Sequence, residues 1–102
     1  MNTANLQLEG LLTAVAGINR TLVAKGLLTA EELDRCLAIA EQTALGDDRV
    51  AEELSPANRD AVVFPIRVLR LANQHAEPGG IPTFAELARM VGETKEPYND
   101  QY

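Results

Sequence analysis

The sequence predicts an all-α protein, a small bundle of about four helices in a single domain. Only 4% of the residues are aromatic, against 46% that are hydrophobic, so the core must be built from leucine, valine, isoleucine and alanine. Apolar residues recur at helical spacing along the chain, and no segment shows a convincing strand pattern. Of the 102 residues, we expect residues 1–92 to form the domain and residues 93–102 to form a flexible tail.

The first predicted helix covers residues 6–25 and ends at a cation followed by a glycine, Lys25 and Gly26. Two internal glycines, Gly10 and Gly17, should each cost the helix about 1 kcal/mol relative to alanine. Close approach of another helix would explain them. Its apolar face is expected to comprise Leu8, Leu11, Leu12, Val15, Leu22 and Val23, with Ile18 at the edge.

A second helix is predicted to follow after a short link and to form an antiparallel hairpin with the first. Thr29 and Glu32 have the spacing of a capping box at its start, and Gly46 marks its end. The predicted core-facing residues are Leu33, Cys36, Leu37, Ala40 and Ala44. In that position Cys36 acts as a small hydrophobic residue rather than a reactive thiol.

The third predicted helix begins with Ser55 as cap and Pro56 in the first turn. Pro65 lies in its interior and should kink or split it. Two apolar faces are expected, one with Val62, Ile66 and Leu69 and the other with Phe64, Val68 and Leu71. A helix with two apolar faces is either the central helix of the bundle or in contact with a second subunit.

A short last helix is predicted after the loop "PGGIP", with a capping box of Thr83 and Glu86 and an end at Gly92. The segment "TFAELARMVG" resembles the first part of a bacterial helix-turn-helix. That resemblance implies a DNA-reading helix after Gly92, but the following "ETKEPYNDQY" is acidic and contains Pro97. We therefore interpret the segment as a capped terminal helix that packs on the bundle through Phe84, Leu87 and Met90.

Charge argues against nucleic acid as the main partner. The formal net charge is −6 and the pI is about 4.6, whereas phosphate-backbone binders usually present a basic face. We expect a cytoplasmic protein, because the start lacks the pattern of a signal peptide and no apolar stretch reaches bilayer length.

No residue pattern points to catalysis, a metal or a cofactor. His75 is the only histidine and has no nearby nucleophile or ligand companion in sequence. The densest acidic cluster lacks the alternation and central glycine of a calcium loop; it consists of Asp47, Asp48, Glu52 and Glu53. We therefore expect neither a cofactor nor a metal, and no enzymatic activity.

Two groups of residues are candidates for binding. One is a stripe of arginines in the third helix, formed by Arg59, Arg67 and Arg70. It either holds an anionic ligand or pairs with nearby acidic side chains. The other group is expected to mediate self-association: Asn19, Leu22, Phe64 and Leu71. Asn19 either fixes the register of a helix interface or bonds water or a carbonyl at its edge.

The leading functional hypothesis is a small cytoplasmic protein–protein interaction module that forms a homodimer, recognises an unknown protein partner and has no membrane association. The alternative is a transcriptional regulator or nucleic-acid accessory protein with a degenerate helix-turn-helix that uses the arginine stripe. A third hypothesis is an enzyme or ligand-binding module with a pocket between helices.

Overall fold

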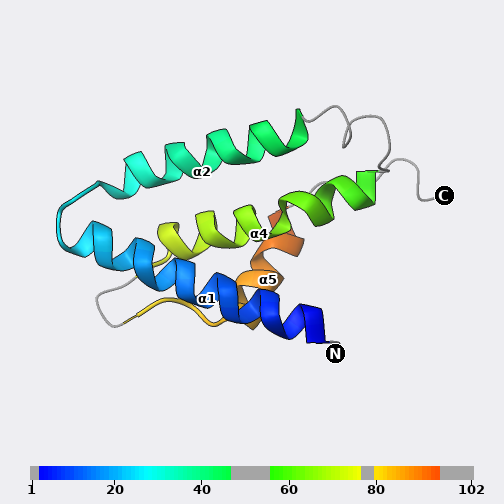
Figure 1. The fold of residues 1–102 in the computed structure, drawn as a ribbon, viewed down its shortest axis with the longest axis horizontal. Helices are drawn as coiled ribbons and strands as arrows, with labels where there is room; N and C mark the ends of the chain where they lie inside the picture. The colour runs from blue at the N-terminus through cyan, green and yellow to red at the C-terminus, as the bar shows by residue number, and fades with distance from the viewer. Residues whose placement is uncertain (1–2, 47–55, 77–79, 95–102) are drawn as a thin grey trace.

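The chain folds into an all-helical structure. The computed structural model describes residues 3–46, 56–76 and 80–94. These residues form four helices: α1 (Thr3–Ala24), α2 (Ala30–Leu45), α4 (Pro56–Gln74) and α5 (Phe84–Thr94). Figure 1 shows α1, α2 and α4 extending along the long dimension of the molecule, with the short α5 lying across α4 and α1. The predicted class and the four predicted helices are therefore confirmed.

α4, the third predicted helix, makes the most contacts with the other helices. α2, α5 and α1 all pack against α4, and the contact between α2 and α4 is the most extensive. α1 and α2 run antiparallel, as expected (Figure 1). However, each has its main contact with α4 rather than with the other. α4 is therefore the helix against which the other three pack.

The helix ends follow the local signals in the sequence. Thr29 and Glu32 form the predicted capping box, with the amide of Glu32 donating to Thr29 Oγ1 at 3.0 Å and the amide of Thr29 donating to Glu32 Oε1 at 2.8 Å. Gly26 has a φ of 75°, and the amide of Leu27 donates to the carbonyl of Leu22 at 3.0 Å. This is a Schellman ending, which requires the left-handed conformation that glycine adopts readily.

The same reciprocal cap starts α5. The amide of Thr83 donates to Glu86 Oε1 at 2.9 Å, and the amide of Glu86 donates to Thr83 Oγ1 at 3.2 Å. These bonds from Thr83 lower the pKa of the Glu86 carboxyl. The cap predicted from the spacing of the two residues is confirmed.

One predicted helix boundary is corrected, and of the two alternatives for Pro65 the split is excluded. α5 passes through Gly92 and ends at Thr94, because Gly92 lacks the positive φ with which a glycine closes a helix. α4 is one helix from Pro56 to Gln74 and is not split at Pro65. The cap predicted at Ser55 and the tail beyond Thr94 lie outside the described residues.

The main core joins α1, α4 and α5. It is aliphatic, and its buried members are Leu12 and Ala16 of α1, Val68 and Ala72 of α4, and Leu87 and Val91 of α5. At its edge, the rings of Phe64 and Phe84 meet edge to face with centroids 6.2 Å apart. α2 contributes one buried residue elsewhere, Leu33.

Three residues assigned to the core in the sequence analysis are at the surface instead. Leu11 is 61% exposed and Val62 is 38% exposed, because the buried faces of their helices run through Leu12 and Val63. Cys36 is also exposed. The reason is that α2 turns Asp34 toward α4 to meet an arginine, which rotates Cys36 away from the interface. None of the described helices is long and apolar enough to span a bilayer.

The glycines of α1 provide a test of the fold. A Cβ added at Gly17 would meet no atom within 4 Å, so none of the described helices approaches it closely. Gly17→Ala should therefore raise the unfolding free energy by about 0.5–1 kcal/mol, through the lost backbone freedom of the unfolded chain. Gly26→Ala is the control and should lower it by about 1–2 kcal/mol, because alanine is strained at positive φ. Urea denaturation of both variants measures the difference, and a destabilised Gly17→Ala protein would contradict this placement of α1.

Candidate interaction surface

The arginine stripe of α4 lies against α2. Arg70 makes a two-pronged contact with Asp34, with Nε 3.0 Å from Oδ1 and Nη2 3.1 Å from Oδ2. Its third donor, Nη1, is 3.3 Å from Glu41 Oε1. The paired geometry fixes the planar guanidinium in one orientation against the carboxylate.

Glu41 extends this contact into a continuous ladder. Its second oxygen lies 3.2 Å from Arg67 Nε, and Arg67 Nη1 lies 3.2 Å from Asp60 Oδ1. We call Asp34, Glu41, Asp60, Arg67 and Arg70 the ion-pair ladder. The side chain of Glu41 is only 15% exposed, which makes this pair better shielded from water than an ordinary surface salt bridge.

Two amide side chains complete the contact between α2 and α4. Asn73 donates to the carbonyl of Ala30 at 2.9 Å, and Gln74 donates to Asp34 Oδ1 at 3.3 Å. Asn73 thereby satisfies one of the polar groups near the start of α2. The face of α4 that meets α2 is thus largely polar around the buried Val63, whereas the face that meets α1 and α5 is aliphatic.

The contact between Asp34 and Arg70 shifts the pKa of both groups. The hydrogen bonds from the Arg70 guanidinium hold the pKa of the Asp34 carboxyl below its usual value, against a smaller opposing effect of desolvation. The same bonds raise the pKa of Arg70. Asp34 is therefore charged in the folded protein wherever it is charged in the unfolded chain.

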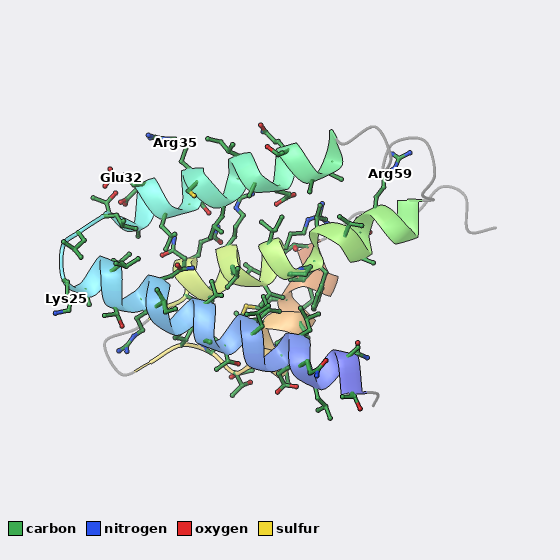
Figure 2. All side chains as sticks on the ribbon, in the orientation of Figure 1. Lys25, Glu32, Arg35 and Arg59 are labelled. Atoms are coloured by element: carbon green, nitrogen blue, oxygen red, sulfur yellow. The ribbon has the colours of Figure 1, made fainter. Side chains whose placement is uncertain are left out.

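Of the two readings of the arginine stripe, the structure displays the pairing with acidic side chains. Arg67 and Arg70 face three carboxylates, so the ladder already carries more negative than positive charge. Arg59 is not part of it and is exposed near the start of α4 (Figure 2). The three arginines are not brought together into one anion-binding site.

The four residues predicted for self-association are also separated. Phe64 and Leu71 pack against the aliphatic core of the same chain. Asn19 lines a groove of about 300 Å³ between α1 and α4, together with Ala16, Val23 and Asn73. Leu22 is half-buried on α1.

An exposed surface with two large hydrophobic side chains lies on α1. We define the α1 outer face as the exposed residues Gln7, Leu11, Ala14, Ile18 and Thr21. Their alternating spacing of four and three places them on one side of the helix, roughly opposite the buried Leu12 and Ala16. Leu11 is 61% exposed and Ile18 is 60% exposed. No residue of this face is charged.

Charge on α1 is distributed in an unusual way. Among its 22 residues only Glu9 and Arg20 are charged, and both lie outside the α1 outer face. A surface helix normally carries its charges on the side opposite the core. α2 follows this rule, with Glu32 and Arg35 projecting outward (Figure 2).

Sequence reasoning missed the α1 outer face because it placed Leu11 in the core and Ile18 at the core's edge. The available signal was the scarcity of charge over 22 residues of a chain that is 24% charged. A helix with so few charges has apolar or small residues on more than one side. A single domain of this size cannot cover both sides of such a helix.

The remaining candidate residues are His75 and the acidic cluster around Asp47. His75 is exposed at the end of α4, and the cluster around Asp47 lies outside the described residues. Within the described ranges, no three His, Cys, Asp or Glu side chains are arranged to hold a metal ion. No protein-family model, curated protein or solved structure matches the chain.

The ladder gives a pH-dependent prediction. Because the folded-state pKa of Asp34 is lowered, its contribution to stability is present above the unfolded pKa of about 3.9 and is lost as the pH falls through the folded value. Arg70→Met should raise the pKa of Asp34 and reduce the unfolding free energy at neutral pH by on the order of 1 kcal/mol. It should also flatten the loss of stability in acid.

Carboxyl chemical shifts measured by NMR across the acid range report the pKa directly, and denaturation at neutral and acid pH reports the stability. Arg59→Met is the matched control, since Arg59 lies outside the ladder. An unchanged Asp34 titration in Arg70→Met would contradict the pairing described above.

Proposed function

We propose that this protein is a small helical protein–protein interaction module that forms a homodimer through the α1 outer face and catalyses no reaction of its own. The observation that carries this proposal is the face itself, which is exposed and uncharged on an acidic chain and is centred on the exposed Leu11 and Ile18. Contiguous apolar surface of this kind marks sites of protein association more often than solvent-facing surface.

The energetic scale is consistent with reversible association. Burying a leucine or isoleucine that is about 60% exposed in the monomer contributes roughly 1–2 kcal/mol. Two copies provide Leu11 and Ile18 twice, and part of that gain offsets the entropy lost on association. The other contacts along α1 add to this gain, and we expect a reversible dimer rather than an obligate one.

The proposed surface differs from the set expected from the sequence. Leu22 is not part of the α1 outer face but lies half-buried beside it, next to Thr21. Phe64 and Leu71 already have partners in the core of one chain, so the proposed interface does not need them. Asn19 faces the groove between α1 and α4.

The nucleic-acid alternative receives little support from the geometry. Two of its three arginines are paired with carboxylates in the ladder, and α5 is followed by residues outside the described ranges. A phosphate backbone would have to compete with these internal carboxylates for the two arginines.

Cytoplasmic location and a kink of α4 at Pro65 stay predictions.

Lysine substitution tests the proposed face. Ile18→Lys should weaken dimerisation at least about tenfold, because it places two buried like charges in the interface. Ile39→Lys is the matched control: Ile39 is 57% exposed on α2, and the substitution changes the net charge equally. Molecular mass should be measured by sedimentation equilibrium over a range of concentrations. Equal effects of both variants, or a wild-type protein that stays monomeric at high micromolar concentration, would refute the proposal.

A further inference from the structure

We infer that α2 is a releasable helix: it detaches from α4 as a unit while α1, α4 and α5 stay assembled, and the ion-pair ladder sets how often this happens. The inference does not depend on the proposed dimer, because the α1 outer face has no part in it. It rests on where the aliphatic core lies, on what α2 buries and on how exposed the charges between α2 and α4 are.

The aliphatic core does not include α2. All the buried members of the core belong to α1, α4 and α5, and Figure 1 shows α2 on the opposite side of α4 from α1. Among the described helices, α2 has its only extensive contact with α4. Detachment of α2 therefore leaves the contacts of α1 and α5 with α4 in place.

The contact between α2 and α4 has few fully buried side chains. Outside the core, the described residues include two buried hydrophobic side chains, Leu33 on α2 and Val63 on α4. Near Leu33, the carbonyl of Ala30 accepts from Asn73. Val63 lies toward the other end of the contact, one turn before Arg67. Hydrophobic stabilisation scales with the apolar area removed from water, so little of it opposes the separation of α2 from α4.

The charges between the two helices are partly open to water. Side-chain exposure in the ion-pair ladder ranges from 15% for Glu41 to 31% for Asp34. Partly exposed ion pairs stabilise a contact modestly, because each charge regains water when the contact opens. The aliphatic side chains of the core have no such compensation. α2 therefore separates from α4 at a lower free energy than α1 or α5 does.

Arg70 is the strongest attachment point in the ladder. Its guanidinium joins Asp34 through two bonds and Glu41 through a third, so one side chain of α4 holds two carboxylates of α2 that are seven residues apart. All three bonds break together when α2 leaves. Loss of the Arg70 guanidinium should therefore favour the detached state of α2 without loosening the aliphatic core.

Detachment changes the surface that α4 presents. Arg70 then loses both of its carboxylates, Arg67 keeps only Asp60 of its own helix, and Val63 becomes accessible. Residues 25–29 keep α2 tethered to α1. In the closed state α2 thus acts as an internal cover over a strip of α4 that combines one apolar side chain with two arginines.

Thiol labelling at two matched sites tests the inference. In a Cys36→Ser background, Val63→Cys lies under α2 and Val68→Cys lies in the core, and both valines are buried, at 0% and 2% exposure. Urea denaturation of each variant gives the labelling rate that global unfolding alone would allow. We expect the thiol reagent DTNB to modify Val63→Cys at least about tenfold faster than this limit. Val68→Cys should react at its limit.

Removal of the ladder's main arginine tests the role of the ion pairs. Arg70→Met should speed the labelling of Val63→Cys about fivefold and leave Val68→Cys at its own global limit. Arg89→Met is the matched control, because Arg89 pairs with Glu93 on α5, and it should change neither rate. Equal effects of the two arginine substitutions on Val63→Cys would overturn the role given to the ladder.

A third site separates detachment of α2 from fraying of α4. If α2 leaves as a unit, Leu33→Cys and Val63→Cys react at similar rates relative to their global limits. A protected Leu33→Cys beside a reactive Val63→Cys means that the start of α4 frays, which overturns the inference. Labelling of Val63→Cys at its global limit overturns the inference as well.

Amide hydrogen exchange of the unaltered protein covers the case in which a buried cysteine disrupts the fold. Amides in the middle of α2 should exchange at least about tenfold faster than amides of α4 around Val68, because they exchange through detachment rather than through global unfolding. Equal protection of α2 and of this part of α4 would show that the helices open only together, and would overturn the inference.

Discussion

The packing of this protein depends on α4, because α1, α2 and α5 each make their main contact with that helix. Its two sides use different chemistry. Toward α1 and α5 it presents the closely buried Val68 and Ala72, whereas toward α2 it presents Arg67 and Arg70 to fixed carboxylates. An aliphatic contact tolerates small shifts, but a two-pronged guanidinium contact fixes the angle of α2 about its own axis. The polar side therefore provides specificity, and the apolar side provides most of the stability.

This arrangement leaves α1 with one covered side and one open side. α4 and α5 cover Leu12 and Ala16, and α2 lies too far round α4 to cover the rest of α1. On α2 the outward-facing surface carries charged side chains such as Glu32 and Arg35. On α1 the outward-facing surface carries Leu11 and Ile18 instead. The exposed side of α1 therefore has the composition of an interface. We propose that a second copy covers it.

The sequence predicted what depends on neighbouring residues and missed what depends on distant ones. Thr29 with Glu32, and the Gly26 ending, are local hydrogen-bond patterns, so their spacing alone identified them. Which side of α1 or α2 faces inward is decided by α4. The predicted core-facing sides of α1 and α2 were therefore rotated by a fraction of a turn, which placed Leu11 and Cys36 in the core. The arginine stripe was recognised, but its partners on α2 are 26 to 36 residues away in the chain.

The most direct test of the central claim, that a second copy covers the exposed side of α1, is the thermal unfolding midpoint as a function of protein concentration. Association that is linked to folding stabilises the native state by mass action. The midpoint should therefore rise steadily when the concentration is increased by about two orders of magnitude through the micromolar range. A midpoint that does not move over that range would show that the folded chain is complete as a monomer and would contradict the claim.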